Sequence, residues 1–311
     1  MSNNDTAFSS GAESSWLLYR EQRSIYLFLN ILFSCFTISS NLVFLVAIAG
    51  STNLQTVSNF FLCSLSVADL SAGILVFPLY SAIAILGVSP SSLWLSKIEK
   101  FVWIQTLVST TFSLTLVSID RYIAVLYPLK YYLLVSEQRC LASIICVWIL
   151  SVAFALPAPF LTEKGVAIIW AVDGVIAVVL PFCIISFCYF HIFKVVRHQS
   201  RRVDTTEISM PPSSLQTDSV HASGGSVRRH HRSAITTFII VGLFLLLFSP
   251  NFIFAFMYVL TEEEACEQAK VLRPWLWGVL VAYSGSFIDP WIYGLRTKEI
   301  KNVVKRMFKC R

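Results

Sequence analysis

The sequence predicts an all-α membrane protein, a bundle of seven transmembrane helices followed by a short amphipathic eighth helix. Hydrophobic residues make up 56% of the chain and charged residues only 14%, with a mean hydropathy of +0.68. This composition is too apolar for an ordinary soluble domain. Seven apolar stretches are long enough to cross the hydrocarbon layer, which takes about 20 residues as a helix. Lipid offers no partner to a bare N–H or C=O, so each stretch must be helical.

The apolar stretches divide the chain into three parts. Residues 1–23 form a polar N-terminal segment, residues 24–295 form the bundle, and residues 296–311 form the eighth helix and the tail. Between the fifth and sixth spans, residues 194–232 are basic and rich in Ser, Thr, Pro and Gly, so we expect a flexible loop with helical ends. The predicted spans are 24–49, 58–86, 98–125, 140–161, 166–193, 233–260 and 272–295.

Basic residues predict the orientation of the bundle. Of the 24 lysines and arginines, seven lie on the N-terminal side of the membrane and sixteen on the other, with Arg121 at a boundary. Because Lys and Arg near helix ends are retained in the cytoplasm, we expect the N-terminus to be extracellular and the chain to lie in the plasma membrane. Asn4 begins an Asn-Asp-Thr sequon on that outer side and is a candidate for glycosylation.

The C-terminal segment alternates apolar and basic residues. Ile300, Val303 and Val304 share one predicted helical face, while Lys301 and Lys305 lie elsewhere on the helix. This pattern is typical of a basic amphipathic helix that lies on the inner leaflet, which makes the lipid bilayer a partner. Cys310, beside this helix, is a candidate for palmitoylation.

Four carboxylates lie at membrane depth: Asp69, Asp120, Asp173 and Asp289. Ionisable groups within lipid are costly, so each is a candidate functional residue. The prediction of function depends on what surrounds them.

Asp120-Arg121-Tyr122 ends the third span and is followed by Ile-Ala-Val-Leu-Tyr-Pro-Leu. Here the sequence resembles the rhodopsin-like G-protein-coupled receptors, over about residues 24–310. Characteristic residues recur in order, one set in each of the other spans: Asn41, Leu65 and Asp69, Trp148, Pro181 and Tyr189, Phe244 and Pro250, and Asp289-Pro290-Trp-Ile-Tyr293.

The resemblance implies a two-state switch. Arg121 can pair with Asp120 and hold the inner helix ends together; the alternative is a merely structural ion pair. In the family the released arginine faces the G protein, supported by tyrosines equivalent to Tyr189 and Tyr293, and the sixth helix moves outward. We assign to the switch Asp120, Arg121, Tyr122, Tyr189, Phe244, Phe248, Pro250, Asp289, Pro290 and Tyr293. Pro181, Pro250 and Pro290 are expected to kink their helices.

The resemblance also implies a sodium ion in the centre of the bundle, and no other cofactor is expected. Asp69 and Asp289, with Thr110 and Ser286, match the family positions that surround this ion. A hard cation prefers such oxygen ligands. The alternative is that one carboxyl is protonated, because a nearby like charge raises a carboxyl pKa.

The ligand site is predicted toward the outer side. Asp173 lies eight residues before Pro181, and a buried anion favours a ligand with a positive group; alternatively, Asp173 pairs with a protein base or faces the headgroups. Trp103 occupies the position where amine receptors carry their amine-binding aspartate, and offers a cation–π surface. Aromatic and polar residues would complete the cavity: Phe248, Asn251, Phe252, Tyr283 and Phe287.

Two departures leave the subfamily open. Ser96 stands where most relatives have the cysteine that ties the third span to an outer loop. Melanocortin, cannabinoid and lysophospholipid receptors also lack this cysteine, and their seventh span has a similar ending. The second span is closer to adenosine and amine receptors. Phe248 replaces the tryptophan usual before the sixth-span proline. A lipid or peptide ligand, a constitutively active receptor, or a non-signalling partner of another receptor therefore stay alternatives.

Other function classes find little support. Four of the five histidines lie in the loop 194–232, and no catalytic grouping or phosphate-binding loop is present in the sequence. An enzyme is therefore not expected, and the absence of internal repeats argues against a transporter. The expected partners are an extracellular small molecule, a heterotrimeric G protein, arrestin, a receptor kinase and lipid, and no nucleic acid.

Overall fold

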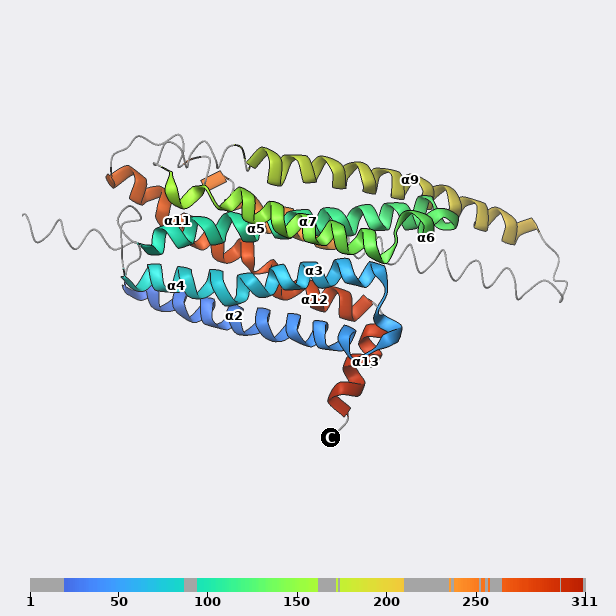
Figure 1. Ribbon diagram of the computed structural model, residues 1–311, viewed down its shortest axis with the longest axis horizontal. Coiled ribbons are helices and arrows are strands. Elements are labelled where there is room, and N and C mark those ends of the chain that lie inside the picture. The colour runs from blue at the N-terminus through green and yellow to red at the C-terminus, as the bar shows by residue number, and fades with distance from the viewer. Residues whose placement is uncertain are drawn as a thin grey trace, which may run out of the picture.

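The computed structural model is an elongated bundle of helices that run nearly side by side (Figure 1). It describes residues 20–86, 94–161, 172, 174–209, 235, 238–251, 253–254, 257, 265–296 and 298–309.

The predicted spans correspond to helical segments of the structure. The first five are long and apolar enough to cross a membrane: Glu21–Ala49, Val57–Leu86, Lys97–Leu126, Glu137–Phe160 and Gly174–Val195. Of the sixth predicted span, the helix Phe238–Asn251 is described. The seventh span consists of two helices, α11 (Ala265–Tyr283) and α12 (Gly285–Arg296).

The remaining bounds follow the chain in order. The long helices are α2 (Arg20–Ala49), α3 (Val57–Ser71), α4 (Phe77–Leu86), α5 (Trp94–Leu126), α7 (Glu137–Ala155), α9 (Leu180–Ser209) and α13 (Lys298–Lys309). The short elements are η1 (Thr52–Leu54), η2 (Ala72–Val76), η3 (Pro128–Lys130), α6 (Tyr131–Leu134), η4 (Ala158–Phe160) and η5 (Gly174–Val179).

Helix α5 is the central helix of the bundle. Of the most apolar window in this span, 83% is buried, against 28% in α2 and 22% in α7. The outer helices instead direct large apolar side chains away from the protein, among them Phe28, Ile149 and Leu246, each more than 60% exposed. In lipid such exposure has no hydrophobic cost, so a bundle can remain stable with apolar residues on its outside. Residues on α5 therefore lie against several other helices, chiefly α3, α7 and α9.

Two wide π-helical turns precede prolines. The turn η2 is followed by Pro78, and η5 is followed by Pro181. Proline has no N–H to donate and its ring clashes with the preceding turn, so the helix widens locally instead of breaking. At η2 the hydroxyl of Ser34 on α2 donates to the carbonyl oxygen of Gly73 at 2.8 Å. The second span, predicted as one helix over 58–86, is thus interrupted by a π-turn.

A third proline shapes the seventh span. Pro290 lies inside α12, where it removes the hydrogen bond that residue 290 would make to the carbonyl of Ser286. The Asn41 side chain, fully buried on α2, donates to that carbonyl at 2.9 Å and to the Thr37 carbonyl at 3.0 Å. The amide of Asn41 therefore satisfies the acceptor that the proline leaves and joins α2 to α12.

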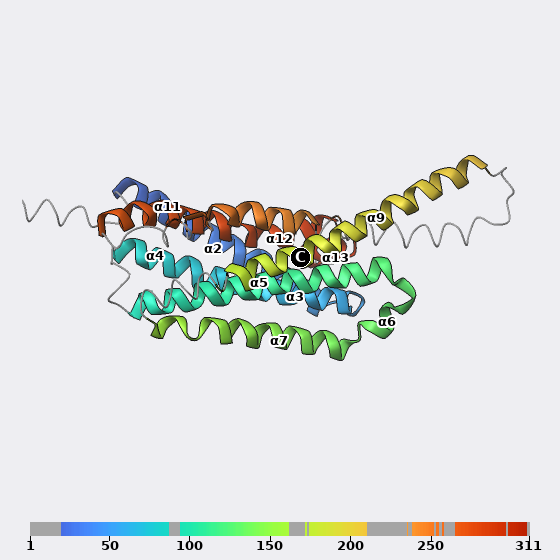
Figure 2. The same cartoon turned by 90° about the horizontal axis from the view of Figure 1, so that it is seen from above.

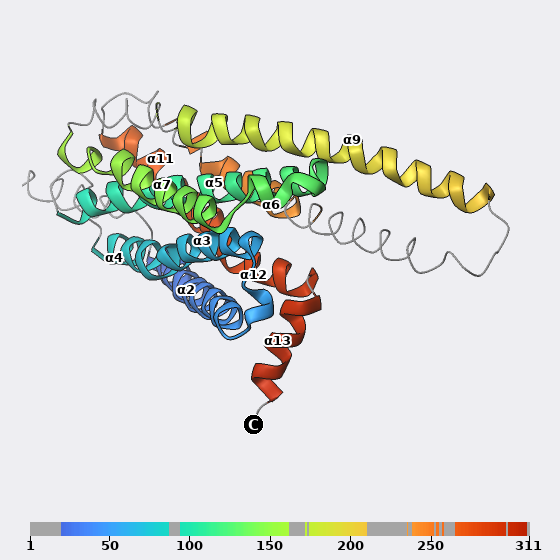
Figure 3. The same ribbon diagram turned by 45° about the vertical axis from the view of Figure 1, so that its right-hand side comes forward.

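The ends of two helices extend away from the bundle. Helix α9 projects far beyond its neighbours (Figure 2). It continues to Ser209, which means that residues 194–209 of the predicted loop are helical. Helix α13 turns aside from α12 (Figure 3). Its Ile300 is 1% exposed and packs with Val303 and Val304, whereas Lys301 and Lys305 are exposed. This is the two-faced helix that the sequence predicted.

The close approach of α2 and η2 yields a test of the packing. A Cβ atom on Gly73 would meet Ile38 Cγ1 at 3.0 Å and Thr37 Cγ2 at 3.2 Å. We expect Gly73→Val to overpack this contact and destabilise the protein by about 1–3 kcal/mol. Thermal unfolding of the purified chain measures this, with Gly242→Ala as the control, since nothing lies within 4 Å of that position. Equal unfolding temperatures for Gly73→Val and the unmodified chain would contradict the packing.

Candidate functional site

The Asp120 carboxylate, at one end of α5, receives several donors. It is 2% exposed and accepts a hydrogen bond from the Ser58 hydroxyl at 2.5 Å and from the Tyr131 hydroxyl at 2.7 Å. The Arg121 Nε lies 3.8 Å from Asp120 Oδ2. These partners come from α3, α6 and α5, so one buried charge connects three elements. The structure brings together the predicted ion pair and adds two donors that we did not predict.

Tyr131 suits its role as a donor. It begins α6, in the connection between the third and fourth spans, where burial and then the negative charge of Asp120 raise the pKa of its phenol. Because a higher pKa keeps the hydroxyl protonated, Tyr131 remains a donor at neutral pH. Pro128 ends α5 just before this segment and directs the chain back toward Asp120. A tyrosine soon after such a proline was the only sequence signal for this contact.

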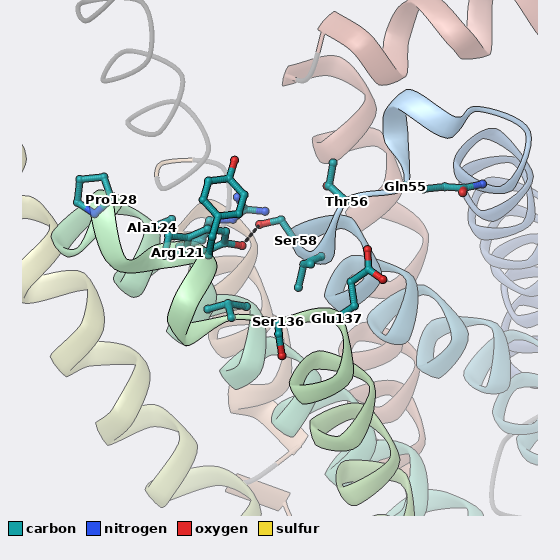
Figure 4. Close-up of a pocket in the computed structure, with 12 residues that line it drawn as sticks. Gln55, Thr56, Ser58, Arg121, Ala124, Pro128, Ser136 and Glu137 are labelled. Atoms are coloured by element: carbon teal, nitrogen blue, oxygen red, sulfur yellow. Dashed lines mark hydrogen bonds between the residues drawn. The ribbon is translucent and has the colours of Figure 1, made fainter.

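A cavity opens beside the ion pair. It has a volume of about 480 Å³, and the Ser58 hydroxyl lies 3.3 Å from the Tyr131 hydroxyl in its lining (Figure 4). Its lining is contributed by the start of α3 and the residues just before it, by the end of α5, by η3 and α6, and by the start of α7 with the residues just before it. The lining residues are Gln55, Thr56, Val57, Ser58, Arg121, Ala124, Pro128, Tyr131, Tyr132, Val135, Ser136 and Glu137. Arg121 is therefore held by Asp120 but borders an open space.

The other switch residues at this end face α9 and the sixth span. The Tyr122 ring packs against Phe187 and His191, with centroids 5.9 Å and 6.2 Å away. Tyr189 is buried and its ring lies 5.5 Å from that of Phe238. These contacts join the end of α5 to α9, and α9 to the helix Phe238–Asn251. The Tyr293 side chain lies outside the described residues.

A second set of predicted residues lies buried in the middle of the bundle. Asp69 on α3, Thr110 on α5, and Ser286 and Asp289 on α12 are each at most 8% exposed. The two carboxylates are close enough to interact electrostatically. Neither carboxylate oxygen of Asp69 has a hydrogen-bond partner among the described residues. A buried anion with unsatisfied oxygens beside hydroxyl and carbonyl groups fits a small hard cation.

Trp148, one of the characteristic residues of the fourth span, makes a hydrogen bond to the second span. Its indole N–H donates to the Ser64 hydroxyl at 3.2 Å, and that hydroxyl lies 3.2 Å from the Ser113 hydroxyl. The three residues belong to α7, α3 and α5. This contact therefore holds the fourth span against the centre of the bundle.

An aromatic stack crosses the bundle nearer its other end. The rings of Phe244 and Phe248 stack with centroids 4.3 Å apart, and Phe248 meets Tyr283 edge-on at 5.5 Å. The Tyr283 hydroxyl is 2.7 Å from the Thr106 hydroxyl on α5. The stack thus joins the sixth span to the seventh and third.

Several predicted ligand residues lie around this stack. Trp103 and Asn251 are both buried, with at most 5% of either residue exposed. The Tyr283 hydroxyl also lies 3.5 Å from the Trp103 carbonyl oxygen. Phe287 lies elsewhere, because its ring packs against Phe33 and Phe36 of α2. Four predicted sites fall outside the described residues: Asn4, Asp173, Phe252 and Cys310.

A bundle of apolar helices with an ion pair at one end and an aromatic stack toward the other defines a membrane protein of the receptor type. The comparisons agree. The family model described as 7 transmembrane receptor (rhodopsin family) matches residues 40–167 and 162–293, so the chain belongs to this family.

Individual relatives are more distant. The chain is 26% identical to the histamine H2 receptor of Cavia porcellus over 94% of this chain and 81% of the relative. It is 26% identical to the human histamine H2 receptor, over 88% of this chain and 77% of the relative. It is 27% identical to the G-protein coupled receptor 161 of Mus musculus, over 84% of this chain and 53% of the relative.

These matches confirm three predictions: the family, the seven-helix fold and the function as a G-protein-coupled receptor in a membrane. The family consists of receptors and not of enzymes. A ligand and a G protein are therefore its partners.

The hold on Arg121 can be tested through Asp120. We expect Asp120→Asn to keep acceptors for Ser58 and Tyr131 but to lose the charge that attracts Arg121. If the attraction between residue 120 and Arg121 weakens by about 1 kcal/mol, the population of receptors in which Arg121 is released increases roughly fivefold. Nucleotide exchange on a G protein, without added ligand, should rise by that factor. Glu299→Gln, which neutralises an exposed carboxylate on α13 outside the cavity, serves as the control. Unchanged basal exchange in Asp120→Asn would contradict this role.

Proposed function

We propose that this receptor transmits the binding of a small extracellular ligand with a positive group to a heterotrimeric G protein, by outward movement of the sixth helix. The N-terminus is on the extracellular side and Arg121 on the cytoplasmic side. The observation that carries the proposal is the buried contact of Asp120 with Arg121, Ser58 and Tyr131 beside an open cavity. A restrained arginine at the edge of an open space is a site that a partner can reach after the restraint is released.

Exposed apolar residues beside Arg121 support a protein partner at this end. Leu129, Tyr132 and Leu133 are 95%, 86% and 75% exposed, all within η3 and α6. Large apolar side chains that gather on a connection between spans indicate an interaction site. We assign this connection to the G-protein surface, together with Arg121 once it leaves Asp120.

The aromatic stack supports movement of the sixth helix. Phe244 and Phe248 lie on the helix Phe238–Asn251, which also contacts Tyr189 through Phe238. Pro250 ends the described part of that helix and lacks the N–H that would bond to Leu246. A ligand that displaces Phe248 from Tyr283 would rotate the helix about this weaker point, and its far end would move away from α9.

The cationic ligand is supported by two features. The likeness to receptors named for histamine brings an amine ligand into the proposal, and Trp103, Phe248 and Tyr283 offer aromatic faces that attract cations. The sequence offers Asp173 as an anionic partner and Asn251 and Phe252 as further neighbours. We also propose arrestin and a receptor kinase as partners, glycosylation at Asn4, and palmitoylation at Cys310 beside the amphipathic α13.

Arg121→Ala tests the transmission of the signal. We expect this variant to lose G-protein activation by candidate amines almost completely, because the guanidinium is the charged group that faces the partner. Cyclic AMP and calcium in cells are the measurements, with Lys301→Ala as a control for the loss of an exposed cation. A response that survives Arg121→Ala at full size would argue against the mechanism.

We further propose that Asp69, Thr110, Ser286 and Asp289 hold a sodium ion, which would supply positive charge between two carboxylates. We expect the purified chain to unfold about 2–4 °C higher in sodium chloride than in N-methylglucamine chloride of equal concentration. Asp69→Asn should remove the difference. Identical unfolding temperatures of the unmodified chain in the two salts would speak for a protonated carboxyl instead.

A further inference from the structure

A buried carboxylate lies at the end of the bundle opposite Arg121. Glu99 is in the second turn of α5 and is 7% exposed. The hydroxyl of Tyr80 on α4 donates to Glu99 Oε1 at 2.5 Å. A carboxylate within a membrane protein is costly to bury, so its presence indicates a functional role.

Tyrosines from three other helices interact with this carboxylate, two of them directly and Tyr26 through Tyr80. Electrostatic interactions connect Tyr80 with Glu99, Tyr26 and Tyr283, and connect Glu99 with Tyr283. Tyr26 belongs to α2 and Tyr283 to α11, so the first, second, third and seventh spans all meet here. The Tyr26 hydroxyl is fully buried and makes no hydrogen bond within the part of the chain that the structure describes. A buried polar group without a partner in the protein is free to bond to a molecule bound beside it.

Aromatic faces complete the site. Trp275 meets Tyr80 edge-on with centroids 6.0 Å apart, and Trp277 meets Tyr26 in the same way at 5.4 Å. Trp103 lies four residues after Glu99, about 6 Å along the helix and on nearly the same face. Several aromatic rings around one carboxylate are the combination that binds organic ammonium groups, through ion pairing and cation–π attraction.

We infer that Glu99 binds the positive group of an organic ammonium ligand, whose apolar body extends along α5 toward Trp103 and Tyr283. This inference rests on the proposed function for the cationic nature of the ligand, and it names the residue that recognises the charge. The anion is thereby placed one helical turn further outward than Trp103, and on α5 instead of on the fifth span with Asp173.

The test uses the purified full chain in detergent and two matched probes. Benzyltrimethylammonium carries the positive charge, and neopentylbenzene has the same shape without it. Binding is measured as the rise in unfolding temperature with probe concentration. We expect the cation to bind the unmodified chain, and Glu99→Gln to weaken its binding by at least about tenfold, because a buried charge loses its partner. Binding of the neutral probe should not change.

Two further variants separate charge recognition from structural support. Glu99→Asp keeps the charge, and Tyr80→Phe removes the donor but keeps the carboxylate; both should retain cation binding within about threefold. Asp173→Asn should also retain it. If Glu99 only supports the fold, Glu99→Gln will lower the unfolding temperature without probe and leave the affinity for the cation unchanged. That result, or loss of cation binding in Asp173→Asn alone, overturns the inference.

G-protein activation is measured separately, so the two proposals can fail separately. If the cation binds in a manner that depends on Glu99 but the chain never activates a G protein, the proposed function is contradicted and the inference about the binding site stands. Activation by an uncharged ligand, with no binding of the cation to the unmodified chain, would overturn the inference and leave the receptor.

Discussion

The buried charge of Asp120 is the constraint on which the Arg121 end of the bundle depends. A carboxylate that is 2% exposed must receive its hydrogen bonds from the protein, because lipid supplies none. Ser58 and Tyr131 provide these hydrogen bonds and Arg121 adds an ion pair, and each of the three residues belongs to a different element. The same contacts that satisfy the charge therefore fix the start of α3, the connection at α6 and the end of α5 relative to one another. If Arg121 leaves, Ser58 and Tyr131 still donate hydrogen bonds to Asp120.

Polar residues on α2 also supply hydrogen bonds that the backbone of neighbouring spans lacks. Pro290 leaves the Ser286 carbonyl without its usual donor, and Asn41 provides one from the neighbouring span. Ser34 makes an equivalent contact with Gly73 at the π-turn before Pro78. Helices that contain prolines can therefore bend at these points without losing satisfied backbone groups. In a receptor this allows the seventh span to change shape near Asp289 while it stays attached to α2.

Local features of the sequence predicted most of the fold. Length and hydropathy identified the spans, and the alternation of Ile300 and Val303 with lysines identified α13. Contacts between side chains were predictable only where neighbouring residues make them, as Asp120 and Arg121 do within α5. Ser58 and Tyr131 were not predicted because hydroxyl groups are common in membrane helices, and their partner becomes evident only when the helices are placed. The site at Glu99 was not predicted, since its aromatic neighbours lie on three other spans and become evident only when the helices are placed.

The aromatic and acidic groups toward the opposite end show how ligand binding could reach Asp120. Glu99, Trp103, Thr106, Thr110 and Asp120 all lie on α5, which is the most buried of the long helices. The Tyr283 hydroxyl contacts Thr106, and the Tyr283 ring contacts Phe248 of the sixth span. A ligand that draws Tyr283 toward Glu99 would disturb both contacts at once. The sixth span contacts α9 near Arg121 through Phe238 and Tyr189, so a shift of Phe248 changes packing at that end. The sixth span therefore connects the aromatic stack at Phe248 with the packing of α9 near Arg121.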